Sequence, residues 1–269
     1  MSEDKQTQAA SESKPTKRRR GIYLLPNLFT TAALFGGFYA ILSAINGRYE
    51  LAVIAIFVAM ILDGLDGRVA RLTNTQSAFG AEYDSLSDMV AFGLAPSLVV
   101  YLWAFQGLGK FGWLAAFVYT AGAALRLARF NTQIETADKR YFQGLPSPAA
   151  AAVLAGAIWV AVDYEWDAAL WAYPFAVITI VTGLLMVSNV RYNSFKEFDP
   201  RDRIPFVALV VIMLGFAIFT LSPPAVLFLG FMAYVISGPI LTLMKLREWR
   251  SERKQVVSEG SPKAPGDER

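Results

Sequence analysis

Four aspartates close together in the sequence carry its most evident chemistry. Asp63 and Asp66 form one pair, and Asp84 and Asp88 form a second pair at i, i+4 spacing. On helices turning about 100° per residue, each pair falls on one face, so two neighbouring helices can present all four carboxylates to each other. Carboxylates that converge in a poorly solvated cleft repel one another unless a cation binds them. We therefore expect a metal site at these four residues.

The kind of metal follows from the residue types that are missing. The sequence contains no histidine and no cysteine, which removes the commonest general base and all imidazole and thiolate ligands. Oxygen ligands alone suit the hard ions Mg²⁺ and Mn²⁺. We expect two metal ions at the site, either Mg²⁺ or Mn²⁺. Catalysis should then use carboxylates, hydroxyls, Lys, Arg and Tyr together with the metal.

Small residues and one arginine accompany the aspartates. Gly67 and Gly80 leave room for a bulky ligand or a neighbouring backbone, and Arg71 offers a planar fork for phosphate. Aspartates near helix ends are also common as caps, and small residues in membrane helices as packing contacts. The complete pattern D-x2-D-G-x2-A-R-x8-G-x3-D-x3-D, which begins at Asp63 and ends at Asp88, argues against that less specific interpretation.

This pattern resembles the motif of the CDP-alcohol phosphotransferase family, whose members displace CMP from a CDP-linked lipid with an alcohol. The resemblance implies that Asp63, Asp66 and Asp84 bind metal. It implies that Asp88 completes the metal site and acts as the general base.

The same resemblance implies a nucleotide site. Gly67, Arg71 and Gly80 match family positions that lie against the CDP moiety. Asn27 corresponds to an asparagine near the nucleotide, although Pro26-Asn27 is also typical of a helix start.

Three later stretches bear on the identity of the acceptor alcohol: residues 126–131, 141–150 and 185–196. They resemble segments of the integral membrane type of bacterial and archaeal phosphatidylserine synthase, so the similarity extends over residues 22–196. It implies CDP-diacylglycerol and L-serine as substrates. A sister enzyme that uses glycerol 3-phosphate or an inositol acceptor is the nearest alternative. A transporter is more remote, because no internal repeat is evident and the carboxylates lie toward one helix end.

Candidate acceptor residues lie in the first of these stretches. Arg126 and Arg129 are one helical turn apart and can bind a carboxylate together, while Asn131 offers a hydrogen-bonding amide. The arginines are equally interpretable as anchors at the cytoplasmic end of a membrane helix.

The composition predicts the elements that position these residues. Of 269 residues, 55% are hydrophobic and only 17% are charged, which is typical of a chain that lies mostly in lipid. We predict an all-α membrane protein of about eight transmembrane helices. The family resemblance implies that six of them form the catalytic core and two are additional. The expected segments are 28–47, 50–72, 82–106, 111–131, 146–163, 168–189, 204–221 and 224–244. The expected domain spans 22–250, between disordered tails at 1–21 and 251–269.

Basic residues predict the orientation. Short Lys and Arg runs, as in 17–20 and 245–254, fall with most other cations on one side of the predicted helices. The positive-inside rule then places the active site and both termini in the cytoplasm, and the protein in the inner membrane. These runs fit anionic lipid headgroups better than nucleic acid, which we do not expect as a partner. The family resemblance implies a homodimer.

Overall fold

The computed structural model describes residues 24–133, 141–193 and 206–259, and each of the eight predicted segments is helical there. The third segment is one continuous helix, Ala78–Leu108, made of five parts. The elements are α1 (Leu24–Ile45), α2 (Tyr49–Leu72), α3 (Ala78–Asp88), η2 (Met89–Leu94), α4 (Ala95–Val100), η3 (Tyr101–Phe105), η4 (Gln106–Leu108), α5 (Lys110–Gln133), α6 (Ser147–Asp163), α7 (Ala168–Val187), α8 (Phe206–Leu221) and α9 (Pro223–Glu259). The predicted class of an all-α membrane protein is confirmed.

Within the described residues, five helices are long and apolar enough to cross a membrane. They are Leu25–Ile45, Ala78–Leu108, Lys110–Thr132, Ala168–Val187 and Pro223–Met244. The other three predicted spans have identifiable reasons for falling short. The α2 helix carries Asp63 and Asp66 together with other charges, while α6 and α8 have only 17 and 16 residues. A carboxylate-bearing α2 is costly in lipid, which marks it as a functional element.

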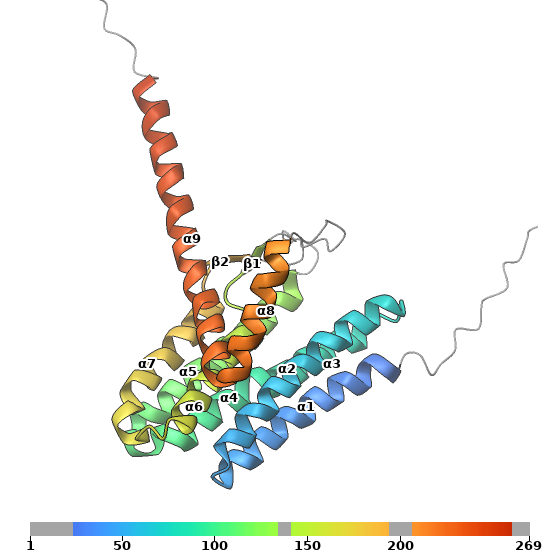
Figure 1. The fold of residues 1–269 in the computed structure, drawn as a ribbon. Helices are drawn as coiled ribbons and strands as arrows, with labels where there is room; N and C mark the ends of the chain where they lie inside the picture. The colour runs from blue at the N-terminus through green and yellow to red at the C-terminus, as the bar shows by residue number, and fades with distance from the viewer. Residues whose placement is uncertain (1–23, 134–140, 194–205, 260–269) are drawn as a thin grey trace, which may run out of the picture.

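Close contacts between small residues set the arrangement of the helices. The α1 and α2 helices form an antiparallel hairpin, α3 lies against α1, and α6 packs between α2 and α9 (Figure 1). The α5 and α7 helices touch through glycines: a Cβ at Gly183 would lie only 2.8 Å from Tyr119 Cα. Similarly, a Cβ at Gly37 on α1 would lie 2.6 Å from Ala91 Cα. Small side chains thus allow the close helix packing that membrane bundles require.

The described chain also contains a small sheet that the sequence did not predict. Strand β1 (Tyr141–Gln143) pairs antiparallel with β2 (Arg191–Asn193), with Phe142 opposite Tyr192. The Tyr192 side chain is fully buried against α9, and its hydroxyl donates to Val235 O at 3.2 Å. The pairing therefore connects two stretches that the sequence singled out separately.

The C-terminal helix corrects one predicted boundary. The α9 helix continues to Glu259, past residue 251, where a disordered tail was expected to begin. It extends away from the bundle in Figure 1. The expected N-terminal tail, 1–21, and the last residues of the C-terminal tail lie outside the described residues.

Candidate active site

The four predicted aspartates meet where α2 faces α3. One carboxylate oxygen from each of Asp63, Asp66 and Asp84 lies within 4.8 Å of the others. Asp63 also lies against Asp88, close enough for the two to share a hydrogen bond if one were protonated. The two helices therefore present their carboxylates to each other, as the spacing predicted. Within the cluster, Asp63 lies between Asp88 and the pair formed by Asp66 and Asp84.

The donor set fits a divalent cation. Asp84 Oδ1 and Asp88 Oδ1 are buried, and neither has a hydrogen-bond partner among the described residues. A buried polar atom without a partner normally costs about 1–3 kcal/mol, and more when the group is charged. A hard metal ion with oxygen ligands would satisfy these atoms and offset the repulsion among the carboxylates.

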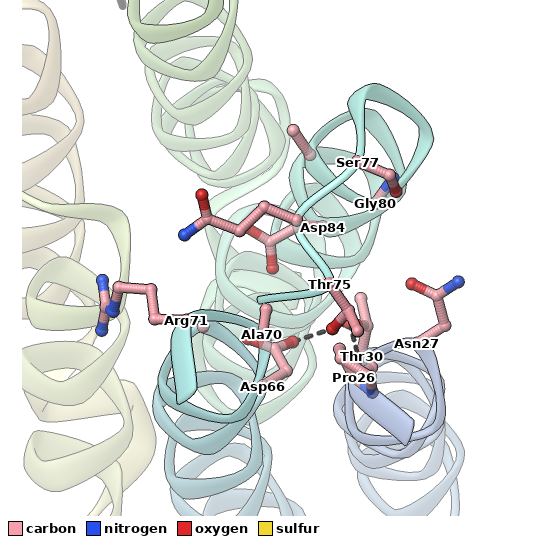
Figure 2. A pocket seen from close by; sticks show the side chains of 13 residues that line it. Pro26, Asn27, Thr30, Asp66, Ala70, Arg71, Thr75, Ser77, Gly80 and Asp84 are labelled. Atoms are coloured by element: carbon pink, nitrogen blue, oxygen red, sulfur yellow. Dashed lines mark hydrogen bonds between the residues drawn. The ribbon is translucent and has the colours of Figure 1, made fainter. Parts of the chain in front are cut away.

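The α1 helix holds one of these carboxylates in place. Thr30 Oγ1 donates a 2.7 Å hydrogen bond to Asp66 Oδ2, drawn as a dashed line in Figure 2. The backbone oxygen of Thr30 accepts a 3.0 Å bond from Ser87 Oγ on α3. One threonine thus connects α1 to both aspartate-bearing helices.

A cavity of about 280 Å³ opens beside the cluster. Its wall contains six of the eight motif positions, in addition to residues from α1 and from the turn between α2 and α3. The lining residues are Pro26, Asn27, Thr30, Asp66, Gly67, Ala70, Arg71, Thr75, Gln76, Ser77, Gly80, Ala81 and Asp84. Asp63 and Asp88 do not line it, so the cluster has one side facing the cavity and another facing away.

The predicted nucleotide residues Asn27, Gly67, Arg71 and Gly80 all line this cavity. A Cβ at Gly67 would meet no atom within 4 Å, so this glycine faces open space. Gly80 N donates a 3.0 Å bond to Ser77 Oγ, the N-cap of α3. In Figure 2 the Arg71 side chain extends away from Asp66 and Asp84, toward the outside of the cluster.

Arg126 faces the aspartates from α5. It is partly buried, donates a 2.7 Å hydrogen bond to Ser147 Oγ at the start of α6, and interacts electrostatically with Asp88 and Asp63. Tyr234 on α9 is also within electrostatic range of this guanidinium. Arg126 therefore lies within electrostatic range of Asp88 and Asp63, the two aspartates that do not line the cavity, and does not line it either.

The other two predicted acceptor residues are occupied elsewhere. Arg129 Nη2 donates to Val187 O at 2.6 Å, and its Nη1 lies near Ser188 O and Asn189 Oδ1, so it caps the C-terminal end of α7. Asn131 accepts from Ser85 Oγ at 3.1 Å and donates to Glu82 Oε2 at 3.3 Å. It therefore links α5 to α3.

The three stretches singled out for the acceptor do come together. Arg126 bonds to Ser147, Arg129 bonds to the end of α7, and β1 pairs with β2. Gly144 accommodates this junction with a positive φ of 79°, and its N–H donates to Val190 O at 2.9 Å. Arg129 and Gly144 thus have structural roles at this junction.

Sequence reasoning missed three polar residues of the site: Thr30, Ser147 and Tyr234. Thr30 is a lone Thr in an apolar segment, which gives no pattern. Ser147 lies in the stretch 141–150, which was singled out, but nothing in the sequence marked its hydroxyl. Tyr234 lies on α9, beyond residue 196, where the recognised similarity ends. Only packing brings it near Arg126.

Comparison with known proteins adds an independent line of support. The family model described as CDP-alcohol phosphatidyltransferase matches residues 23–185. A Helicobacter pylori (strain ATCC 700392 / 26695) protein named CDP-diacylglycerol–serine O-phosphatidyltransferase is 39% identical over 195 residues, covering 72% of this chain and 82% of the relative. A protein of the same name from Mycobacterium tuberculosis (strain ATCC 25618 / H37Rv) is 31% identical over 249 residues, covering 88% and 85%. One from Methanocaldococcus jannaschii is 37% identical over 142 residues, covering 53% and 63%.

Proposed function

Because the chain belongs to the CDP-alcohol phosphatidyltransferase family, we propose that it transfers the phosphatidyl group of CDP-diacylglycerol to L-serine and releases CMP. The serine hydroxyl attacks the phosphorus that carries diacylglycerol. The bond from that phosphorus to the CMP oxygen breaks, the hydroxyl proton passes to a base, and CMP leaves as the anion. The observation that carries this proposal is the convergence of four carboxylates beside a cavity lined by the family's nucleotide positions.

The aspartates are proposed to hold the metal. Asp63, Asp66 and Asp84 would bind it, and the unpaired oxygens of Asp84 and Asp88 support a second ion between α2 and α3. Mg²⁺ or Mn²⁺ bound there would neutralise the diphosphate and the leaving CMP. Thr30 fixes the orientation of Asp66 through its 2.7 Å bond.

The cavity is proposed to take the nucleotide. Gly67 provides open space for it, and Asn27 and the Ser77–Gly80 turn supply polar groups along the wall. Arg71 also lines the cavity, and its guanidinium could bind a phosphate oxygen of the ligand. The volume of about 280 Å³ is suited to part of the ligand, while the acyl chains extend into lipid.

Asp88 is the proposed general base, and Arg126 the proposed acceptor contact. Arg126 is within electrostatic range of Asp88 and does not line the cavity, so serine bound beside it would reach the cluster from outside the proposed nucleotide cavity. The serine carboxylate would pair with the Arg126 guanidinium, while the serine hydroxyl points to Asp88. Arg129 and Asn131 are proposed to support this site through α7 and α3.

The proposed setting is the inner membrane, with the active site and both termini in the cytoplasm, because Lys and Arg concentrate on that side of the helices. A homodimer is proposed from the family resemblance, and mass photometry of the detergent-purified protein would test it. Membrane lipid surrounds the exposed apolar side chains, which include Phe35, Leu170 and Val177.

An acceptor panel tests the proposed function. Purified protein with CDP-diacylglycerol and Mg²⁺ or Mn²⁺ is given L-serine, glycerol 3-phosphate, inositol or ethanolamine, and CMP release is measured. Serine should be preferred. Preference for glycerol 3-phosphate or inositol would identify a sister enzyme, and absence of metal-dependent CMP release with every acceptor would favour a transporter.

A further inference from the structure

The helix that carries Asp84 and Asp88 changes its winding immediately after Asp88. Residues Met89–Leu94 form a π-helical turn, and Ala95 N–H donates to Val90 O, five residues back. Pro96 follows and has no N–H, so it cannot close an α-helical bond to Phe92 O. Pro96 thus removes the α-helical donor to Phe92 O, and a donor from a neighbouring helix can take its place.

The α5 helix supplies that donor. The Tyr119 hydroxyl donates a 3.0 Å hydrogen bond to Phe92 O, and both side chains are fully buried. The backbone at Tyr119 packs against α7, because Gly183 has no side chain and lets the backbones of α5 and α7 approach closely. The donor thus lies on a pair of closely packed helices.

The same face of α5 also reaches the aspartate cluster. Ala123, one turn after Tyr119, contacts Gly93: a Cβ at Gly93 would lie 3.0 Å from Ala123 Cβ. Arg126, one turn further, interacts with Asp88. One face of α5 thus contacts the π-turn at Phe92 and Gly93 and also carries the guanidinium that interacts electrostatically with Asp88.

A π-turn holds one residue more than an α-turn, so its conversion to α geometry would rotate one end of the helix by about 100° relative to the other. The C-terminal part cannot rotate, since Val99, Val100 and Phe105 are fully buried in the core. The end that carries Asp84 and Asp88 would move instead.

We infer that Tyr119 is a positioning residue for Asp88. Its hydroxyl bonds to Phe92 O and thereby stabilises the π-turn that orients the Asp88 carboxylate toward the cluster. The inference rests on the proposed function in taking Asp88 as the general base. Tyr119 itself touches no reacting atom.

The test compares two tyrosines that make the same kind of bond to one helix, one at its middle next to the aspartates and one near its C-terminal end. Tyr49 OH donates a 3.0 Å hydrogen bond to Leu102 O in the second π-helical segment, far along the helix from Asp88. Tyr119→Phe and Tyr49→Phe each remove one such hydroxyl. Both variants should have a lower Tm. Only Tyr119→Phe should lose kcat, by about tenfold or more, since a 1 Å misplacement can cost about 10²-fold. Its KM for CDP-diacylglycerol should change less than about twofold.

A second readout does not need turnover. Mn²⁺ binding to the purified protein, measured by paramagnetic titration, should weaken in Tyr119→Phe and not in Tyr49→Phe, because Asp84 and Asp88 move together. If wild-type protein binds Mn²⁺ but releases no CMP with any acceptor, the proposed function fails while this readout still decides the positioning role.

A double variant separates positioning from simple satisfaction of a buried carbonyl. In Pro96→Ala/Tyr119→Phe, the new backbone N–H can bond to Phe92 O in α geometry. We expect Tm to recover and kcat to stay low. Recovery of both would overturn the inference, as would equal kcat and Mn²⁺ affinity in Tyr119→Phe and Tyr49→Phe. If Tm does not recover, the comparison of the two single variants decides.

Discussion

Thr30 Oγ1 on α1 donates a 2.7 Å hydrogen bond to Asp66 Oδ2 on α2, and both residues are buried, with exposed fractions of 4% and 5%. Thr30, which does not belong to the family motif, therefore orients the carboxylate of Asp66, which does. Ser87 Oγ bonds to the backbone oxygen of the same threonine, so α1, α2 and α3 meet at this point. The aspartate cluster depends on the first helix as well as on the two that carry it.

Thr30→Val should weaken metal binding. A hydrogen bond to a charged group contributes about 1.5–3 kcal/mol, or roughly a tenfold to hundredfold change at 1.4 kcal/mol per decade. The Mn²⁺ concentration for half-maximal CMP release should rise by that factor. Thr31→Val is the matched control, because its exposed hydroxyl bonds to Asn27 O and Tyr83 OH instead of an aspartate. Identical metal dependence of the two variants would contradict the role of Thr30.

Metal removal should abolish activity. EDTA should stop CMP release and added Mg²⁺ or Mn²⁺ should restore it, because the cluster has only carboxylate ligands. Asn at Asp63, Asp66 or Asp84 should weaken metal and nucleotide binding together, while Asp88→Asn should chiefly lower kcat. Full activity in excess chelator would rule out the metal site. Near wild-type turnover of Asp88→Asn would exclude it as the base.

Two glycines on α2 test the nucleotide cavity. Gly67→Leu should raise the KM for CDP-diacylglycerol by about tenfold or more, since its side chain would enter space reserved for the ligand. Gly64→Leu is the control: a Cβ there also meets nothing within 4 Å, but Gly64 does not line the cavity. The two changes cost the helix similar amounts, so an equal KM for both would argue against the cavity as the nucleotide site.

The two arginines of α5 should behave differently. Arg126→Ala should raise the KM for serine by about tenfold to hundredfold, as expected for a lost charge-assisted hydrogen bond, with a smaller effect on CDP-diacylglycerol. Arg126→Lys should restore only part of the loss if the contact is bidentate. Arg129→Ala should mainly lower Tm, because it uncaps α7.

Ethanolamine, which has no carboxylate, serves as the control substrate. It should be a poor acceptor for the wild-type protein and should be little affected by the Arg126 change. A larger serine KM effect for Arg129 than for Arg126 would reverse this assignment.

Cysteine labelling tests the orientation, since the natural sequence has no cysteine. A single cysteine at Asp163, in the exposed end of α6, should react with an impermeant thiol reagent on intact cells. One at Gln133, at the end of α5, should react only after the cells are opened. The reverse labelling pattern would invert the proposed topology.

Local sequence was sufficient to predict the helices and the aspartate cluster. Helical periodicity decides which residues share a face, so Asp63 with Asp66 and Asp84 with Asp88 could be assigned to facing surfaces without coordinates. The absence of His and Cys restricts the metal to one that prefers oxygen ligands. These properties depend on spacing and residue type within one segment or two adjacent ones.

Tertiary structure alone decided which distant groups meet. Arg126 and Arg129 have the same charge and lie one turn apart, yet one faces Asp88 and the other caps α7. Their partners come from helices whose rotation about their own axes depends on packing, including the close contact at Gly183. The bond from Tyr119 to Phe92 likewise depends on that packing. Hydrogen bonds between helices require both partners within about 3 Å and in line, and one-dimensional spacing does not specify that geometry.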